Sequence, residues 1–181
     1  MLILKSSEVM PCGVVWPGSP EVLLGVSHQG RAYAVEQLYK VGRTGAVAQM
    51  RERLDHPRVS NEVVIMVEEP SGYRLYSWVN GCQEVSYEQA TAMVCEKMRQ
   101  SPYLAVGDRR WGLRVFKKAF VGSEAVTWLA DYLQITRPEA VAFGQLCIRH
   151  THFRHVLGEQ DFADEYYFYR FRQDGDPEGR V

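Results

Sequence analysis

The chain has 181 residues, 46% of them hydrophobic and 24% charged, with a formal net charge of −1. This composition excludes collagen-like and disordered classes and fits one large or two small globular domains. The four cysteines form no CxxC pair and the N-terminus lacks the features of a signal peptide, so we expect free cysteines in a reducing cytoplasm. No apolar run is long enough to span a bilayer.

The first hairpin and helix are predicted within residues 1–54. Two short apolar runs in residues 1–15 precede a hairpin that pairs 22–26 with 32–39, turning at Gly30. Apolar residues at helical spacing then predict a helix over 46–54, with Thr44 as its N-cap.

A second hairpin follows that helix. Residues 63–67 are apolar at every position, which predicts an interior strand, and the alternation over 73–79 predicts a half-exposed partner. The order of two strands, a helix and two strands predicts a small α+β unit of ββαββ type. We recognise no family in residues 1–86.

In the second half of the chain, capping residues indicate where the predicted helices begin. Ser86 and Gln89 predict a capping box for a helix over 87–100. Gly107-Asp108 and Gly112 are turn residues around short strand-like pieces within 106–120, and Ser123 is expected to cap the next helix. Thr136 and Glu139 predict a second capping box, for a helix over 137–150, before two strands at 153–156 and 166–171.

A series of separate anchors runs along this half of the chain. They are Phe120-Val-Gly-Ser-Glu-Ala-Val-Thr-Trp-Leu129, Thr136-Arg-Pro-Glu-Ala-Val-Ala-Phe-Gly-Gln145, His155-Val156, Phe162 and Tyr166-Tyr-Phe-Tyr-Arg-Phe171. In this order and spacing, residues 87–172 resemble the DEP domain. The resemblance implies a small winged helix that docks to membranes or signalling partners and is not an enzyme. It also implies a protruding hairpin arm over 107–119 and a wing made of the strands 153–156 and 166–171. Two positions depart from the family pattern: Thr151 stands where Gly is usual, and Thr127 where an acid is common.

The fold class expected is therefore α+β, with three segments. Residues 1–84 form the small N-terminal domain, 85–173 the DEP-like winged helix, and 174–181 a polar C-terminal tail.

The strongest candidate for binding is the hairpin arm. Residues 97–118 hold seven basic residues against one acid, Asp108. Such a surface suits anionic lipid headgroups or an acidic protein partner, with a Trp as anchor at the boundary. The candidate partner- or membrane-binding residues are Arg109, Arg110, Trp111, Arg114, Lys117 and Lys118. The alternative is a solvated face with Trp111 packed into the body.

Three other kinds of functional site have weaker support in the sequence: a metal site, a nucleic-acid platform and a catalytic site. Cys147, His150, His152 and His155 are metal-ligand types at poor spacing, so no metal is expected. The aromatic run 166–171 is interpreted as packing and not as a platform for single-stranded nucleic acid. No nucleophile elbow or phosphate loop is present, so we expect no catalytic residues and no cofactor.

The sequence thus predicts a non-catalytic adaptor or regulatory protein that docks to a protein partner, an anionic membrane surface, or both. A cytoplasmic location with peripheral membrane association is expected. Alternatives are a winged-helix protein that binds nucleic acid, disfavoured by the few charges on 137–150, and a small-molecule sensor or enzyme built from residues 1–86. Exposed strand edges in the first half are compatible with a homodimer.

Overall fold

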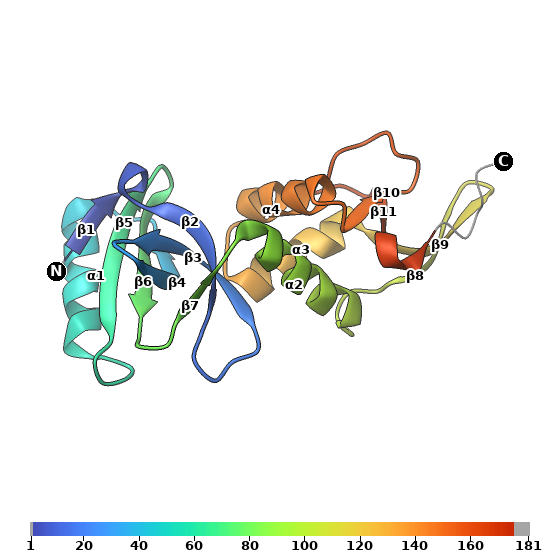
Figure 1. Ribbon diagram of the computed structural model, residues 1–181. Coiled ribbons are helices and arrows are strands. Elements are labelled where there is room, and N and C mark those ends of the chain that lie inside the picture. The colour runs from blue at the N-terminus through green and yellow to red at the C-terminus, as the bar shows by residue number, and fades with distance from the viewer. Residues whose placement is uncertain (1, 176–181) are drawn as a thin grey trace. The chain divides into compact units, whose positions relative to one another are not determined.

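The computed structural model describes residues 2–175 (Figure 1). The chain divides into two compact units, Met1–Ala90 and Thr91–Val181, and the division falls inside helix α2 (Tyr87–Gln100). The domain bounds predicted from the sequence stay a prediction. Most of the predicted polar tail, from residue 176 onward, lies outside the described residues.

The N-terminal unit is a seven-stranded sheet in the order β1-β5-β6-β4-β3-β2-β7. Strands β1 and β5 pair in parallel, and every other pair is antiparallel. The strands are β1 (Leu2–Lys5), β2 (Met10–Val15), β3 (Val22–His28), β4 (Arg31–Tyr39), β5 (Val63–Glu69), β6 (Gly72–Trp78) and β7 (Gln83–Val85), with a short 3-10 helix η1 (Ser6–Glu8) after β1.

Both predicted hairpins are present, β3 with β4 and β5 with β6. The ββαββ pattern was incomplete, because β6 also pairs with β4 and the strands β1, β2 and β7 extend the same sheet. The prediction of a half-exposed second hairpin strand was wrong: residues 73–77 are all buried. Both faces of β6 are covered, so alternation of residue type does not report exposure there.

Helix α1 (Arg43–Asp55) covers one face of this sheet (Figure 1). Ala46 and Met50 pack there against Val64, Met66 and Leu75. The other face forms a second core that includes Leu4, Val26, Tyr33, Ile65 and Tyr76.

The predicted N-cap of α1 was misplaced. The helix starts after Gly42, and the Ala46 amide donates to the Gly42 carbonyl at 3.0 Å, so Thr44 lies inside the first turn.

A buried ion network fixes α1 to the sheet. The Arg53 guanidinium donates to Glu36 at 2.9 Å and to Glu62 at 2.6 Å, and both carboxylate side chains are almost fully buried. Burial of these charges is tolerated because each is paired and hydrogen-bonded.

The C-terminal unit has the helices and wing expected of a winged helix. Its four-stranded sheet has the order β10-β11-β9-β8. Its elements are α2, β8 (Gly107–Trp111), β9 (Arg114–Val121), α3 (Gly122–Leu133), α4 (Arg137–Arg149), β10 (Phe153–His155), β11 (Phe168–Phe171) and the 3-10 helix η2 (Arg172–Asp174). The second wing strand is shorter than predicted and begins at Phe168.

An aromatic cluster forms the centre of this unit. The Phe120 ring lies 5.4 Å from Phe153 and 4.8 Å from Phe171, and Phe162 lies 5.1 Å from Tyr169, all between ring centroids. The Tyr169 hydroxyl donates to the Asp161 carbonyl at 2.7 Å, which ties the loop before β11 to this core. The interpretation of 166–171 as packing is therefore confirmed from Phe168 onward, since every residue of β11 is buried.

For helices α2, α3 and α4, two of the three predicted N-terminal caps are present. The predicted capping boxes are present: Gln89 N–H donates to Ser86 Oγ at 3.2 Å, and Thr136 N–H donates to Glu139 Oε2 at 2.7 Å. Ser123 does not cap α3, which starts one residue earlier. The amides of Gly122 and Ser123 instead donate to backbone carbonyls of residues 167 and 165, because the loop before β11 crosses the start of the helix.

Thr151 ends helix α4 in the left-handed conformation, with φ +63°. Its amide donates to the Ile148 carbonyl and the His152 amide to the Cys147 carbonyl, both at 2.9 Å. These are the two hydrogen bonds of a Schellman cap, so a β-branched residue occupies the position that favours glycine.

Candidate docking hairpin

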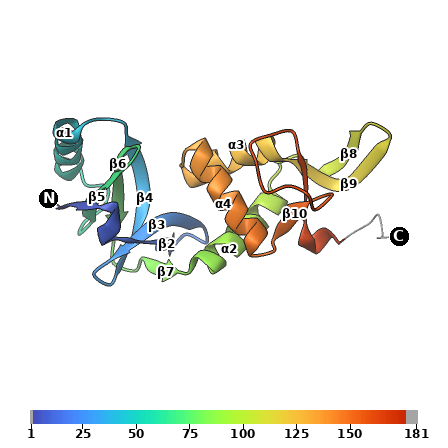
Figure 2. The same ribbon diagram turned by 90° about the horizontal axis from the view of Figure 1, so that it is seen from above.

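Strands β8 and β9 form a hairpin that projects from the helices of the C-terminal unit (Figure 2). Trp111 pairs with Arg114 at its end, so Gly112 and Leu113 form a two-residue turn. Gly112 has φ +59°, which a glycine adopts without strain. The predicted arm is therefore an antiparallel hairpin.

The tip of this hairpin is apolar and exposed. Leu113 is 95% exposed, Trp111 65% and Val115 48%. The Trp111 ring tilts against Tyr166, with centroids 6.3 Å apart, but most of its surface stays in solvent. The alternative of a Trp111 packed into the body does not hold.

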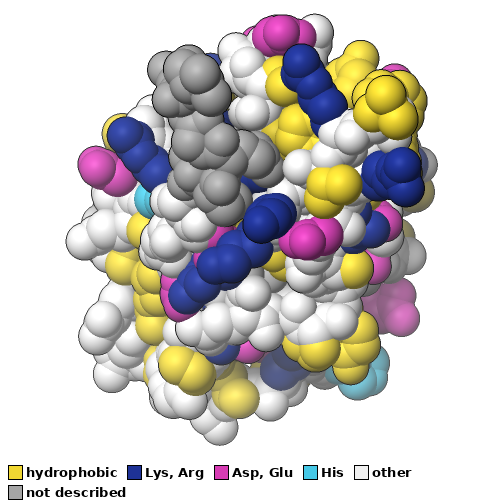
Figure 3. All heavy atoms as spheres, turned by 90° about the vertical axis from the view of Figure 1, so that its right-hand side faces the viewer, with side chains coloured by type: hydrophobic (Ala, Val, Ile, Leu, Met, Phe, Trp, Pro, Cys, Tyr) yellow, Lys and Arg dark blue, Asp and Glu magenta, His cyan; other side chains and the backbone are white. Residues whose placement is uncertain are grey.

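Exposed cations run along the hairpin from its turn to its base. Arg110 and Arg114 lie next to the turn, and Lys117 and Lys118 lie toward the base. The Arg110 Nε donates to the Gly112 carbonyl at 3.2 Å, which holds that side chain against the turn. In the view onto this end of the protein, Lys and Arg side chains lie among exposed hydrophobic ones (Figure 3).

Arg109, in contrast, belongs to the base of the hairpin. Its guanidinium donates to the Glu124 carboxylate at 3.1 Å and to backbone carbonyls of Ala105 and Ala119. It therefore joins the hairpin to helix α3.

A buried arginine that the sequence analysis did not single out secures the same base. Arg170 on β11 is only 1% exposed, and its Nε donates to the Lys117 carbonyl at 2.8 Å. Next to it, Lys118 has φ +50° and its amide donates to Asp108 at 3.3 Å, at an irregularity in the pairing of β8 with β9. Arginine is a common surface residue, so alternation in 166–171 gave no signal of this contact.

A groove of about 230 Å³ runs beside the hairpin. Trp111 and Phe116 line it from the hairpin, and Val156, Leu157 and Tyr166 line it from the loop between β10 and β11. Leu157 and Tyr166 are 47% and 57% exposed, so the apolar surface of the tip continues onto this loop.

The candidate metal ligands make other contacts. The Thr91 hydroxyl lies 2.8 Å from His150 Nδ1 and 3.1 Å from His152 Nε2, whereas the His155 ring packs on Tyr169 with centroids 5.5 Å apart. Burial lowers the pKa of His155, and the nearby Glu159 charge offsets this in part. Residues 2–175 contain no group of three or more ligand side chains placed to hold a metal ion.

Within the same range, no helix has both the length and the apolar content needed to cross a membrane.

One family model matches residues of the C-terminal unit. Residues 103–171 match the model described as "Domain found in Dishevelled, Egl-10, and Pleckstrin (DEP)". The match includes the hairpin, helices α3 and α4, and the wing.

Several curated proteins are similar to part of the chain. The vacuolar membrane-associated protein IML1 of Saccharomyces cerevisiae is 41% identical over 66 residues, which are 35% of this chain and 4% of that protein. IML1 of Coccidioides immitis is 36% identical over 86 residues, 46% of this chain and 5% of the relative. The human phosphatidylinositol 3,4,5-trisphosphate-dependent Rac exchanger 2 protein is 40% identical over 70 residues, 38% of this chain and 4% of that protein. The chain thus spans only a small part of each relative.

Proposed function

Since residues 103–171 form a DEP domain, we propose that the chain is a non-catalytic regulatory protein that docks to an anionic membrane surface through the hairpin β8–β9. One observation carries this proposal. The hairpin presents Leu113 almost fully to solvent, with Trp111 beside it and the cation of Arg114 next in the chain.

The order of these side chains matches the layers of a bilayer surface. An apolar turn enters the boundary between headgroups and acyl chains, and a Trp ring prefers that boundary. Cations behind the tip stay at the level of the lipid phosphates, where each contributes about 1 kcal/mol. A hairpin with exposed cations but a polar tip would lack the first of these contributions.

The names of two relatives support a membrane as the target. IML1 is described as vacuolar membrane-associated, and the human relative as dependent on a phosphoinositide. Both descriptions concern proteins much longer than the matched region, and they favour a regulatory protein at the periphery of a membrane. The hairpin is the exposed part of the shared region best suited to that contact.

Co-sedimentation of the whole chain with lipid vesicles tests the proposal. We expect binding to vesicles that contain phosphatidylserine, weaker binding as salt is raised, and no binding to phosphatidylcholine alone, because screening weakens attraction between exposed charges. A third set of vesicles with a phosphoinositide at matched total charge shows whether the headgroup or the surface charge is recognised.

Matched variants locate the contact. The double substitution Arg114→Glu and Lys118→Glu should abolish sedimentation with anionic vesicles, and Leu113→Ser should weaken it while leaving every charge in place. The control is Lys40→Glu with Arg51→Glu, which makes the same change in net charge at exposed positions of the N-terminal unit. Equal loss in the control would mean that only net charge matters.

The other outcome concerns a protein partner. If the chain does not co-sediment with any of the vesicles, the membrane proposal fails. The same hairpin variants can then be compared with the unmodified chain in a search for an acidic protein that binds it.

A further inference from the structure

Helices α2 and α4 meet along a face that plays no part in the docking hairpin. The Thr91 hydroxyl on α2 lies 2.8 Å from His150 Nδ1, just after the end of α4. One turn later on α2, Cys95 neighbours Cys147, which lies one turn earlier on α4. Burial and, after it, the neighbouring Cys95 raise the pKa of the Cys147 thiol well above its ordinary value. Residues four and three apart share a helix face, so these two contacts are successive rungs between antiparallel helices. Their geometry places two free thiols opposite each other.

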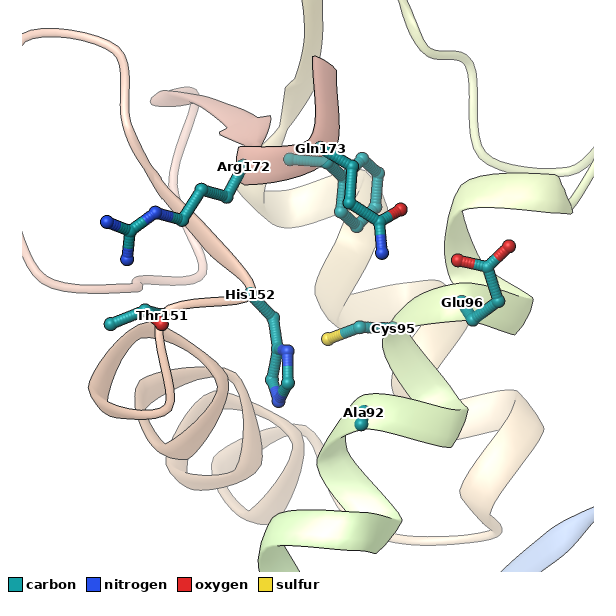
Figure 4. Close-up of a pocket in the computed structure, with 8 residues that line it drawn as sticks. Ala92, Cys95, Glu96, Thr151, His152, Arg172 and Gln173 are labelled. Atoms are coloured by element: carbon teal, nitrogen blue, oxygen red, sulfur yellow. The ribbon is translucent and has the colours of Figure 1, made fainter. Parts of the chain in front are cut away.

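The two thiols differ in access to solvent. Both are buried, but Cys147 is 0% exposed, whereas Cys95 is 5% exposed and borders an open hollow of about 410 Å³ that His152 and Thr151 also line. Figure 4 shows the Cys95 sulfur directed toward the side of the hollow where the His152 ring stands. The His152 ring is held there by its Nε2 contact with Thr91 at 3.1 Å. A small oxidant that enters the hollow therefore meets Cys95 first, with an imidazole nearby.

We propose that Cys95 is a site of oxidation by hydrogen peroxide and that Cys147 converts the product into a disulfide between α2 and α4. In the first step the Cys95 sulfur attacks one peroxide oxygen and the O–O bond breaks. Cys95 becomes a sulfenic acid, and the departing hydroxide leaves as water with the thiol proton, which the His152 imidazole can hold in transit.

In the second step the Cys147 sulfur attacks the Cys95 sulfur. The S–O bond breaks, the S–S bond forms, and a second water leaves with the Cys147 proton. Two thiols and one peroxide thus give one disulfide and two waters. Because the two thiols are neighbours in the reduced protein, no helix has to unfold for this step. The raised pKa of Cys147 leaves little thiolate, so the nearness of the Cys95 sulfur has to drive this attack.

The other two cysteines provide an internal comparison. Cys12 and Cys82 belong to one hydrophobic cluster of the N-terminal unit. Burial, together with the Glu84 charge, raises the pKa of Cys12 to about 12, and burial also raises the pKa of Cys82. Cys82 is half-buried and so more exposed than Cys95, which means that exposure alone would not favour Cys95. The comparison therefore tests whether the hollow and the neighbouring thiol direct the reaction to Cys95.

The first test uses the unmodified chain, so it does not depend on variants that fail to fold. Protein treated with hydrogen peroxide is alkylated, digested and mapped by mass spectrometry, with untreated protein as the reference. We expect a cross-linked peptide pair joining Cys95 to Cys147, while Cys12 and Cys82 remain open to alkylation. The double variant Cys12→Ser and Cys82→Ser should give the same cross-link at the same rate.

Two single variants separate the steps. In Cys147→Ser the sulfenic acid on Cys95 has no resolving thiol, and we expect dimedone to label that position. In Cys95→Ser the buried Cys147 should not be labelled. The proposal is overturned if Cys95 reacts no faster than Cys12 and Cys82, or if the only disulfides found link two chains. None of these readouts involves lipid, so this proposal and the docking proposal stand or fall separately.

Discussion

The guanidinium of Arg109 donates to the Glu124 carboxylate across 3.1 Å and so links the docking hairpin to the first turn of helix α3. Arg109 and Arg114 are both basic residues of the same hairpin, yet the first is only 22% exposed in its side chain and the second has its side chain in solvent. The basic residues predicted as one binding set are thus not equivalent: Arg109 holds the hairpin against α3, whereas Arg114 exposes its cation to solvent.

This division gives a prediction for two alanine variants. Arg109→Ala should speed amide exchange in β8 and β9, because it removes a salt bridge and two contacts to backbone carbonyls. Arg114→Ala should leave that exchange unchanged and lower vesicle affinity about fivefold, the equivalent of one surface cation. Hydrogen exchange and vesicle titration check the two effects. Identical exchange in both variants would contradict a positioning role for Arg109.

A second prediction concerns the close approach of Gly144 to Phe162. A Cβ atom on residue 144 would stand 2.0 to 2.7 Å from atoms of the Phe162 ring, and that ring is fully buried against Phe153 and Tyr169. The ring cannot move away, so Gly144→Ala should lower the free energy of unfolding by about 2 kcal/mol or more.

The partner substitution supplies the control for Gly144. Phe162→Leu should reduce the additional cost of Gly144→Ala, because a smaller side chain leaves room for the methyl group. A double-mutant cycle by urea denaturation measures this coupling. Strict additivity of the two costs would show that the contact is not the cause.

Gly144 also shows where sequence reasoning stops. The helix over 137–150 and its capping box could be predicted, because they depend on residues close together in sequence. A glycine inside such a helix indicates the close approach of another element, and at Gly144 that element is an aromatic ring from a loop. Local pattern marks a close approach without identifying the neighbour, since that depends on how the chain folds back.

The candidate site shows the same limit. The hairpin and its basic residues were predictable from composition and from the family resemblance, whereas the sequence left open whether Trp111 is exposed or packed into the body. The role of Arg109 was not, because it depends on Glu124 lying beside the hairpin base, and the buried Arg170 was missed for the same reason. Charge patterning counts cations but does not separate those satisfied by the fold from those left in solvent.

Thr151 gives a third prediction, in the direction of higher stability. Its backbone is left-handed, which costs a β-branched residue about 1–2 kcal/mol, and glycine avoids that cost but loses more entropy on folding. Thr151→Gly should therefore raise the free energy of unfolding by about 0.5 to 1 kcal/mol. Thr151→Ala keeps the strained backbone and serves as the control, with little change expected. Urea denaturation of the unmodified chain and of the two variants measures these differences. A lower free energy of unfolding for Thr151→Gly would mean that the threonine side chain stabilises the fold by more than the left-handed backbone costs.

The last prediction is a pH dependence located at His155. Its ring is buried against Tyr167 and Tyr169, and its Nδ1 accepts the Glu159 amide at 3.4 Å, which requires a neutral ring. Burial lowers its pKa in the folded state below the ordinary value of 6.5, so the unfolded chain binds a proton more readily. The contribution of neutral His155 to stability is therefore complete above pH 6.5 and is lost as the pH falls through 6.5 toward the lowered folded pKa.

Amide exchange in residues 153–171, followed from about pH 7.5 to about pH 5.5 and corrected for intrinsic rates, measures this loss as a growing population of the open state. His155→Gln keeps an acceptor for the Glu159 amide but cannot titrate, so the dependence should flatten in that variant. His56→Gln, at an exposed position of the N-terminal unit, should leave it unchanged. If the pH dependence of amide exchange persists in His155→Gln, protonation of His155 does not open the wing and another group must titrate.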